Sequence, residues 1–95
     1  MAGYIIVEVD VTDAEAYEKY KPLAGASVAR HGGKFIVRGG RTETLEGGWA
    51  PKRLVVLEFP TVEKAREFYH SEDYAPALKM RLAASKSRAL IVEGA

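Results

Sequence analysis

Apolar and polar residues alternate along four stretches of the chain, and this two-residue period indicates β-strands. In the first stretch, Ile5, Val7 and Val9 share one face, and the residues between them share the other. The run from Arg53 to Phe59 is the richest in β-forming residues and alternates in the same way. The predicted strands are residues 4–11, 34–38, 53–59 and 87–93.

Apolar residues at helical spacing separate these strands and predict helices. Thr12 and Glu15 are spaced as a capping box, in which each side chain bonds the backbone amide of the other. Pro22 lacks a backbone donor and therefore predicts a kink or a break in this first helix. Thr61 predicts the start of a second helix and Ser71 that of a third. The apolar stripes are Tyr17, Tyr20, Ala24 and Val28 in the first helix, and Tyr74, Leu78 and Leu82 in the third.

Two glycine pairs, Gly32-Gly33 and Gly39-Gly40, bracket the second strand. The first pair ends the helix before it, because glycine reaches the left-handed backbone region at little steric cost. By alternation, Lys34, Ile36 and Arg38 share one face of the strand. That face mixes charge with an aliphatic side chain, which is typical neither of a core nor of a solvated surface.

The predicted order of elements is β-α-β-β-α-β, with the second helix in two pieces. This order predicts an α+β protein of the ferredoxin-like fold, in which helices cover one face of a four-stranded antiparallel sheet. We expect one domain, residues 1–95, because no change in composition marks a linker.

The face of the sheet that the helices leave uncovered is too apolar to remain in water. Six of its ten predicted residues are large and apolar or aromatic, so we expect two copies to pack face to face as a homodimer. Arg38 would then pair with Glu8 or Glu58 inside the interface. The ten residues are Tyr4, Ile6, Glu8, Ile36, Arg38, Leu54, Val56, Glu58, Ile91 and Glu93.

Composition excludes several classes of partner and site. The 14 basic and 13 acidic residues nearly cancel, so we expect neither nucleic acid nor a membrane as a partner. There is no cysteine, which removes thiolate chemistry and fits a reducing compartment. Two distant histidines predict no metal site, and we expect no cofactor. No signal peptide or membrane-length apolar run is visible, so we expect a cytoplasmic protein.

A series of short motifs along the chain resembles a bacterial family catalogued as domain of unknown function 1330 (DUF1330). The family is similar in fold to the dimeric α+β barrel superfamily, which includes antibiotic-biosynthesis monooxygenases and muconolactone isomerases. The resemblance implies a dimer with clefts between each sheet and its helices or its partner. It implies no reaction, because none of the active-site motifs of those enzymes matches this chain. The motifs are Gly32-Gly33-Lys34-Phe35, Arg38-Gly39-Gly40, Leu45-Glu46-Gly47 with Trp49 and Pro51, Arg53, Glu58-Phe59-Pro60, Ala65, Phe68-Tyr69, Ser71, Tyr74, Arg81 and Val92-Glu93-Gly94.

His31 is the candidate catalytic residue. It directly precedes Gly32, where it could act as a general base or bind an anion. The simpler interpretation is a histidine placed favourably at the negative end of a helix. His70 ends the second helix and has the same simple interpretation.

Arginines supply the candidate ligand-binding residues. Arg38 and Arg53, together with Glu58, are suited to an acidic small molecule, because a guanidinium holds a carboxylate with two hydrogen bonds. The alternative is an ion pair between subunits. Arg81, on the third helix, could contribute to the same pocket.

Three aromatic residues complete the candidate site. Tyr69 and Tyr74 would line a pocket, although aromatics at helical spacing more often belong to the core. Trp49 lies in a glycine-rich loop and would serve as a lid or as an anchor at the dimer edge.

Three interpretations follow. The first is a dimer that binds a small acidic or aromatic molecule, with or without cofactor-independent catalysis, and it predicts that His31, Arg38 and Trp49 converge on one cavity. The second is an assembly or regulatory dimer without a pocket, in which these residues point apart. The third is a haem- or metal-using relative, which absorbance and metal analysis of the purified protein would test.

Overall fold

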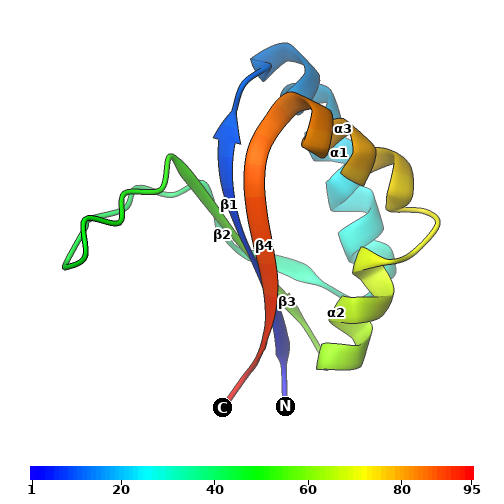
Figure 1. Cartoon of the computed structure of the whole chain (residues 1–95). Helices are drawn as coiled ribbons and strands as arrows, with labels where there is room; N and C mark the ends of the chain where they lie inside the picture. Colours follow the sequence, from blue (N-terminus) through cyan, green and yellow to red (C-terminus); the bar gives the residue numbers. More distant parts are fainter.

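The computed structural model describes residues 1–95 and confirms the ferredoxin-like arrangement. Four antiparallel strands form one sheet in the order β2-β3-β1-β4, and all three helices lie on one side of it (Figure 1). No helix is both long and apolar enough to span a membrane. In chain order the elements are β1 (Gly3–Val11), α1 (Ala14–Arg30), β2 (Lys34–Arg38), β3 (Arg53–Phe59), α2 (Val62–Tyr69), α3 (Ala75–Ala84) and β4 (Ser85–Glu93).

Helix α1 differs from its prediction at two points. Its N-cap is Asp13, whose carboxylate accepts the amide of Ala16 at 3.1 Å, so the capping box at Thr12 is wrong by one residue. The helix also runs unbroken through Pro22, so of the two predicted outcomes, a kink or a break, the break is wrong. A proline costs about 3 kcal/mol inside a helix, and burial of Tyr17, Ala24 and Val28 against the sheet offsets that cost.

The hydrophobic core lies between the sheet and the helices, with the alternate residues of β1 at its centre. Ile5 and Val9 are almost completely buried, and so is Phe59 at the end of β3. Phe68 of α2 stacks on Phe59 with ring centroids 5.1 Å apart, which joins α2 to the sheet. The alternating pattern assigns Ile5, Val7 and Val9 of β1 to the core, and these residues do lie on the face that the helices cover.

Strand β4 presents the opposite face from the one predicted. Leu90 pairs with Ile6 and Val92 with Tyr4, so the two β4 residues belong to the open face, where they are 57% and 42% exposed. Ile91 pairs with Ile5 and packs against the core, so its placement on the open face, with Glu93, is wrong. Alternation divides a strand into two sets, and both sets of β4 are apolar. The pattern therefore does not indicate which set meets the helices.

A β-bulge at Ile36 moves Arg38 to the helix side of the sheet. The register runs from Phe35 opposite Leu57 to Val37 opposite Val56, so one extra residue of β2 is accommodated between the two pairs. From there Arg38 pairs with Val55, whose side chain is buried under the helices. The predicted shared face of Lys34 and Arg38 is therefore wrong, because a bulge reverses the alternation beyond it.

The acidic residues of the open face have other partners than Arg38. Glu58 pairs with Lys34 at 3.2 Å, and Glu8 pairs with Arg88 at 2.7 Å. The predicted pairs of Arg38 with these two carboxylates are wrong.

The long connection between β2 and β3 projects from the open face of the sheet, away from the helices (Figure 1). Gly47 and Gly48 adopt positive φ angles of 77° and 63° at its far end. Trp49 follows them and is 54% exposed. It lies beside Leu54 and Leu90, on the open face, so the loop extends the apolar surface of that face.

Candidate functional site

A cavity lies between the sheet and the helix layer of the protomer. Counted together with the open solvent at its mouth, the hollow measures about 530 Å³. The enclosed cavity itself is about 30 Å³, which is room for about two water molecules. An organic ligand therefore has to displace side chains at the opening. The lining residues are Ile5, Val7, Val9, Tyr17, Tyr20, Lys21, Ala24, Val28, Phe35, Arg38, Arg53, Val55, Leu57, Phe68, Tyr69, Tyr74 and Arg81.

The charges around this cavity are all of one sign. Four of its lining residues are cationic and none is an aspartate or a glutamate. Among the cationic residues only Lys21 pairs with a carboxylate, that of Glu18 on the same helix. In a chain with a net charge of only +1, this concentration of positive charge in one apolar hollow is specific to the cavity.

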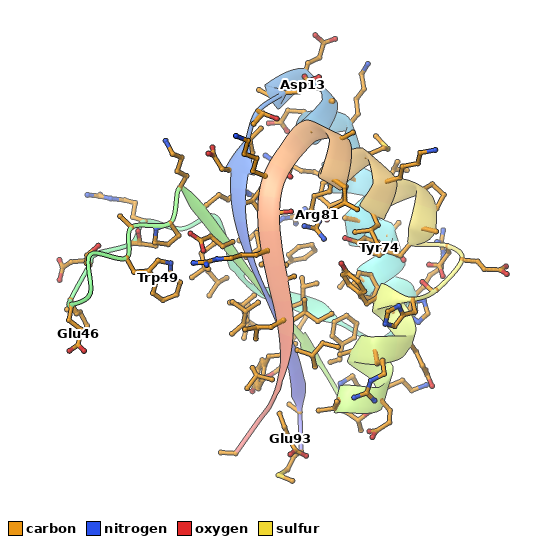
Figure 2. All side chains as sticks on the ribbon, in the orientation of Figure 1. Asp13, Glu46, Trp49, Tyr74, Arg81 and Glu93 are labelled. Carbon is orange, nitrogen blue, oxygen red and sulfur yellow. The ribbon has the colours of Figure 1, made fainter.

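Arg81 is the most unusual of these residues, because it is 2% exposed and no carboxylate reaches its guanidinium. One of its terminal nitrogens donates to the hydroxyl of Ser87 on β4, while the Nε–H has no hydrogen-bond partner. Figure 2 shows Arg81 and Tyr74 in the space between the sheet and the helices. A buried charge without a counter-ion is costly, so such groups are rare in folded proteins.

Three tyrosines connect Arg81 with Arg53. The hydroxyls of Tyr20 and Tyr74 are 2.9 Å apart. The ring centroids of Tyr17 and Tyr20 are 5.3 Å apart, and Nε of Arg53 donates to the hydroxyl of Tyr17 at 3.3 Å. Two separate hydroxyl contacts, Tyr20 with Tyr74 and Tyr17 with Arg53, thus lie in a cavity whose walls are otherwise apolar.

The protonation states in this group follow from burial and contact. Burial, followed by the neighbouring Tyr74 hydroxyl, raises the pKa of Tyr20 far above its ordinary value. Burial alone would lower the pKa of Arg81, but its interactions with Tyr74, Tyr20 and Tyr69 together more than reverse this, and the net pKa is raised. At neutral pH the site therefore combines the charged guanidinium of Arg81 with the neutral phenol of Tyr20.

The cations on the more exposed side of the cavity lie on β2 and α1. The guanidinium of Arg38 lies over the ring of Phe35, 4.0 Å from its centroid, and its Nη2 lies near Gly25 of α1. Arg38 as a whole remains exposed, and the Lys21 side chain is 31% exposed. Flexible cationic side chains thus border the entrance, while Arg81 lies at the inner end.

The structure brings together four of the predicted ligand-binding residues and separates the other two. Arg38, Arg53, Tyr69 and Arg81 line the cavity. Trp49 and Glu58 lie on the open face of the sheet, and Figure 2 shows Trp49 on the side away from Tyr74. The predicted convergence of His31, Arg38 and Trp49 on one cavity is therefore wrong.

His31 belongs to a different cluster, at the C-terminal end of α1. Its Nε2 lies 3.0 Å from Oδ1 of Asp73, and its ring packs edge-on against Phe68. Oδ2 of Asp73 accepts the hydroxyl of the buried Ser27 at 2.6 Å. These hydrogen bonds hold the pKa of Asp73 well below its usual range. The cluster ties the end of α1 to the segment between α2 and α3.

Sequence reasoning missed that two residues of the inward stripe of α1 line the cavity. It assigned Tyr17 and Tyr20 to a packing stripe. The signal that it missed is the hydroxyl, because a tyrosine in place of an aliphatic residue brings a polar group into the core. It also chose Leu82 for the stripe of α3. Leu82 is 59% exposed, and the buried stripe is Ala77, Arg81 and Ala84.

Comparison with known proteins gives the family of the chain. A model described as Domain of unknown function (DUF1330) matches residues 2–95. The chain belongs to the DUF1330 family. This confirms the resemblance carried by its motifs. Among curated proteins, none matches the sequence.

Solved structures share the fold of this DUF1330 protein at low sequence identity. RPA0582, a protein of unknown function from Rhodopseudomonas palustris, is 24% identical with a TM-score of 0.79, over 99% of this chain and 82% of that one. SnoaB, a cofactor-independent oxygenase from Streptomyces nogalater, is 15% identical with a TM-score of 0.66, over 99% and 93%. A dimeric ferredoxin-like protein of unknown function from Thermobifida fusca is 14% identical with a TM-score of 0.60, over 99% and 92%. At these identities the likeness establishes the fold alone.

Proposed function

We propose that this DUF1330 protein binds a small acidic molecule with an apolar or aromatic body in the cavity between the sheet and the helices of each protomer. The observation that carries the proposal is the charge of the lining, with four cations and no acid around an otherwise apolar hollow. Apolar walls with a few placed polar groups are typical of small-molecule sites. Positive charge at the opening also attracts an anion before it binds.

The lining supports recognition better than acid–base catalysis. The cavity is bordered by no histidine, aspartate or glutamate, and burial raises the pKa of Tyr20, which is the opposite of what a general base needs. SnoaB is a cofactor-independent oxygenase of the same fold. For this chain, the groups in the cavity supply hydrogen-bond donors and positive charge, which suit the holding of an anion.

The open face of the sheet is the proposed surface of a homodimer. It presents a continuous apolar area in which Ile6, Val56 and Leu90 lie on adjacent strands. An exposed apolar area of this kind on a small protein is typical of an interaction surface. A second copy related by a two-fold axis would bury it against the same surface of its own. The ion pairs of Glu8 and Glu58 neutralise the acids within this face. A structurally similar protein from Thermobifida fusca is described as dimeric.

A ligand-observed NMR screen tests the binding proposal. A set of small aromatic and aliphatic carboxylates should include molecules that bind, and Ala24→Met should weaken their binding because Ala24 is buried in the cavity wall. Ala26→Met is the matched control, since Ala26 lies exposed on the same helix. If no carboxylate binds, or if both variants bind as the wild type does, the cavity is not a ligand site.

A further inference from the structure

The guanidinium of Arg81 is the one charged group of the molecule that is buried and has no carboxylate partner. Its side chain lines the cavity, and its Nε–H makes no hydrogen bond. By contrast, Arg30 and Arg88 are exposed and each contacts a carboxylate. An arginine that serves only to hold the fold together would be expected to have its charge compensated within the protein.

We infer that Arg81 is the anchor for the carboxylate of a singly charged ligand, whose apolar body extends from there toward the opening. The inference rests on the proposed function and names the orientation and charge of its ligand. The bound carboxylate supplies the counter-ion that the protein does not, and the unpaired Nε–H supplies one hydrogen bond to it.

The tyrosine pair beside Arg81 provides a second donor. When two hydroxyls share one hydrogen bond, one donates and the other accepts, so one of the two phenolic protons stays free. For Tyr20 and Tyr74 that proton is available to the ligand. One Nε–H and one phenol match the two oxygens of a carboxylate. A single buried positive charge likewise matches one negative charge, which disfavours phosphate and other dianions at this position.

The opposite orientation would place the carboxylate at the entrance, on Arg38. That side chain is exposed, so water already solvates its charge, and it stacks on Phe35. Binding an anion there gains little, because exposed ion pairs contribute weakly. The entrance arginine therefore attracts the ligand, and the inner one holds it.

Benzoate and its neutral isostere benzamide test the inference on the full-length protein by isothermal titration calorimetry. We expect the wild type to prefer benzoate by about 10- to 100-fold, since the discriminating contacts are charge-assisted hydrogen bonds. Arg81→Met should abolish that preference and leave benzamide binding intact. Arg38→Gln should reduce the affinity for benzoate only a few-fold, with most of its effect on the association rate.

Two further variants keep the test decisive if Arg81→Met folds poorly. Tyr74→Phe keeps the ring and removes one hydroxyl of the pair, and it should lower the preference for benzoate without loss of fold. Arg66→Gln removes an exposed arginine of α2 and is expected to change nothing. Equal binding of benzoate and benzamide to the wild type, or a preference that survives in Arg81→Met, would overturn the inference. A preference that survives in Arg81→Met leaves the proposed function standing with its anchor elsewhere, whereas equal binding to the wild type also removes the acidic character of the proposed ligand. If neither compound binds, the inference fails and the carboxylate screen decides the function.

Discussion

Replacing Arg81 with methionine should stabilise the ligand-free protein, which is the reverse of what most core substitutions do. Methionine is flexible and apolar, so it fills much of the space of the arginine stem among Ala77, Ala84 and the tyrosines. The prediction separates a residue kept for binding from one kept for the fold.

The expected size follows from the contacts of the guanidinium. The unpaired Nε–H costs about 1–3 kcal/mol, and burial of the charge adds to that cost. Against this, the variant loses the hydrogen bond to Ser87, which is about 1.5–3 kcal/mol for a charged donor. Ser87 is half-buried, so its hydroxyl can turn to water and part of that loss is recovered. The balance is a stabilisation of about 1 kcal/mol, or about 4–8 °C in Tm for a domain of this length.

Thermal unfolding followed by circular dichroism, at one fixed protein concentration, measures this difference. In the presence of benzoate at about 100 times its Kd, the wild type should gain about 2.7 kcal/mol and overtake the variant. A Tm that falls in Arg81→Met, with no recovery by benzoate in the wild type, would show that the guanidinium serves the fold and would refute the reasoning.

Three further predictions address the surface, the acid range and the backbone. Leu90→Glu should convert a dimer into a monomer by light scattering, whereas Leu82→Glu, at a leucine of similar exposure on α3, should leave the mass unchanged; equal behaviour would remove the open face as the interface. Because the pKa of Asp73 is lowered in the folded state, the unfolded chain takes up this proton at a higher pH than the folded one. The wild type should therefore lose stability as pH falls below about 4, and Asp73→Asn should lack this part of the stability loss in pH-dependent denaturation. Gly3→Ala should destabilise by about 1–3 kcal/mol in urea unfolding, because its Cβ would lie 2.6 Å from the backbone of α2, whereas Gly40→Ala, with open space around it, should cost little.

The fold could be predicted because each element carries its own period. Strand β1 alternates without interruption, and its predicted inner face is the buried one. The α2 start at Thr61 also agrees, since its hydroxyl accepts the amide of Lys64. What failed was the choice between two faces that are both apolar, as for Ile91 in β4, because that choice depends on the neighbouring strand and not on the strand itself.

The site could be predicted in its residue types but not in its arrangement. Arginine as a carboxylate-binding group is a statement about chemistry, and Arg38, Arg53 and Arg81 do meet at one cavity. The burial of Arg81 depends on the rotation of α3 about its axis. Leu82 is more hydrophobic and lies one position away, so an apolar stripe predicts the wrong residue. Only the packing of α3 against α1 and β4 decides it.

The bulge at Ile36 changes both faces of the sheet at once. Its one extra residue reverses which side chains of β2 point toward the helices and which point toward the open face. Without it, alternation would continue from Lys34 and place Arg38 on the open face, where it would add a second cation to that edge of the sheet. With it, Val37 takes that place opposite Val56, and Arg38 joins the cavity. The open face becomes more apolar and the cavity more basic by the same local change. β-bulges commonly re-aim side chains beside functional sites, and here the re-aimed residue supplies charge to the proposed ligand site while a valine completes the surface proposed for the second copy.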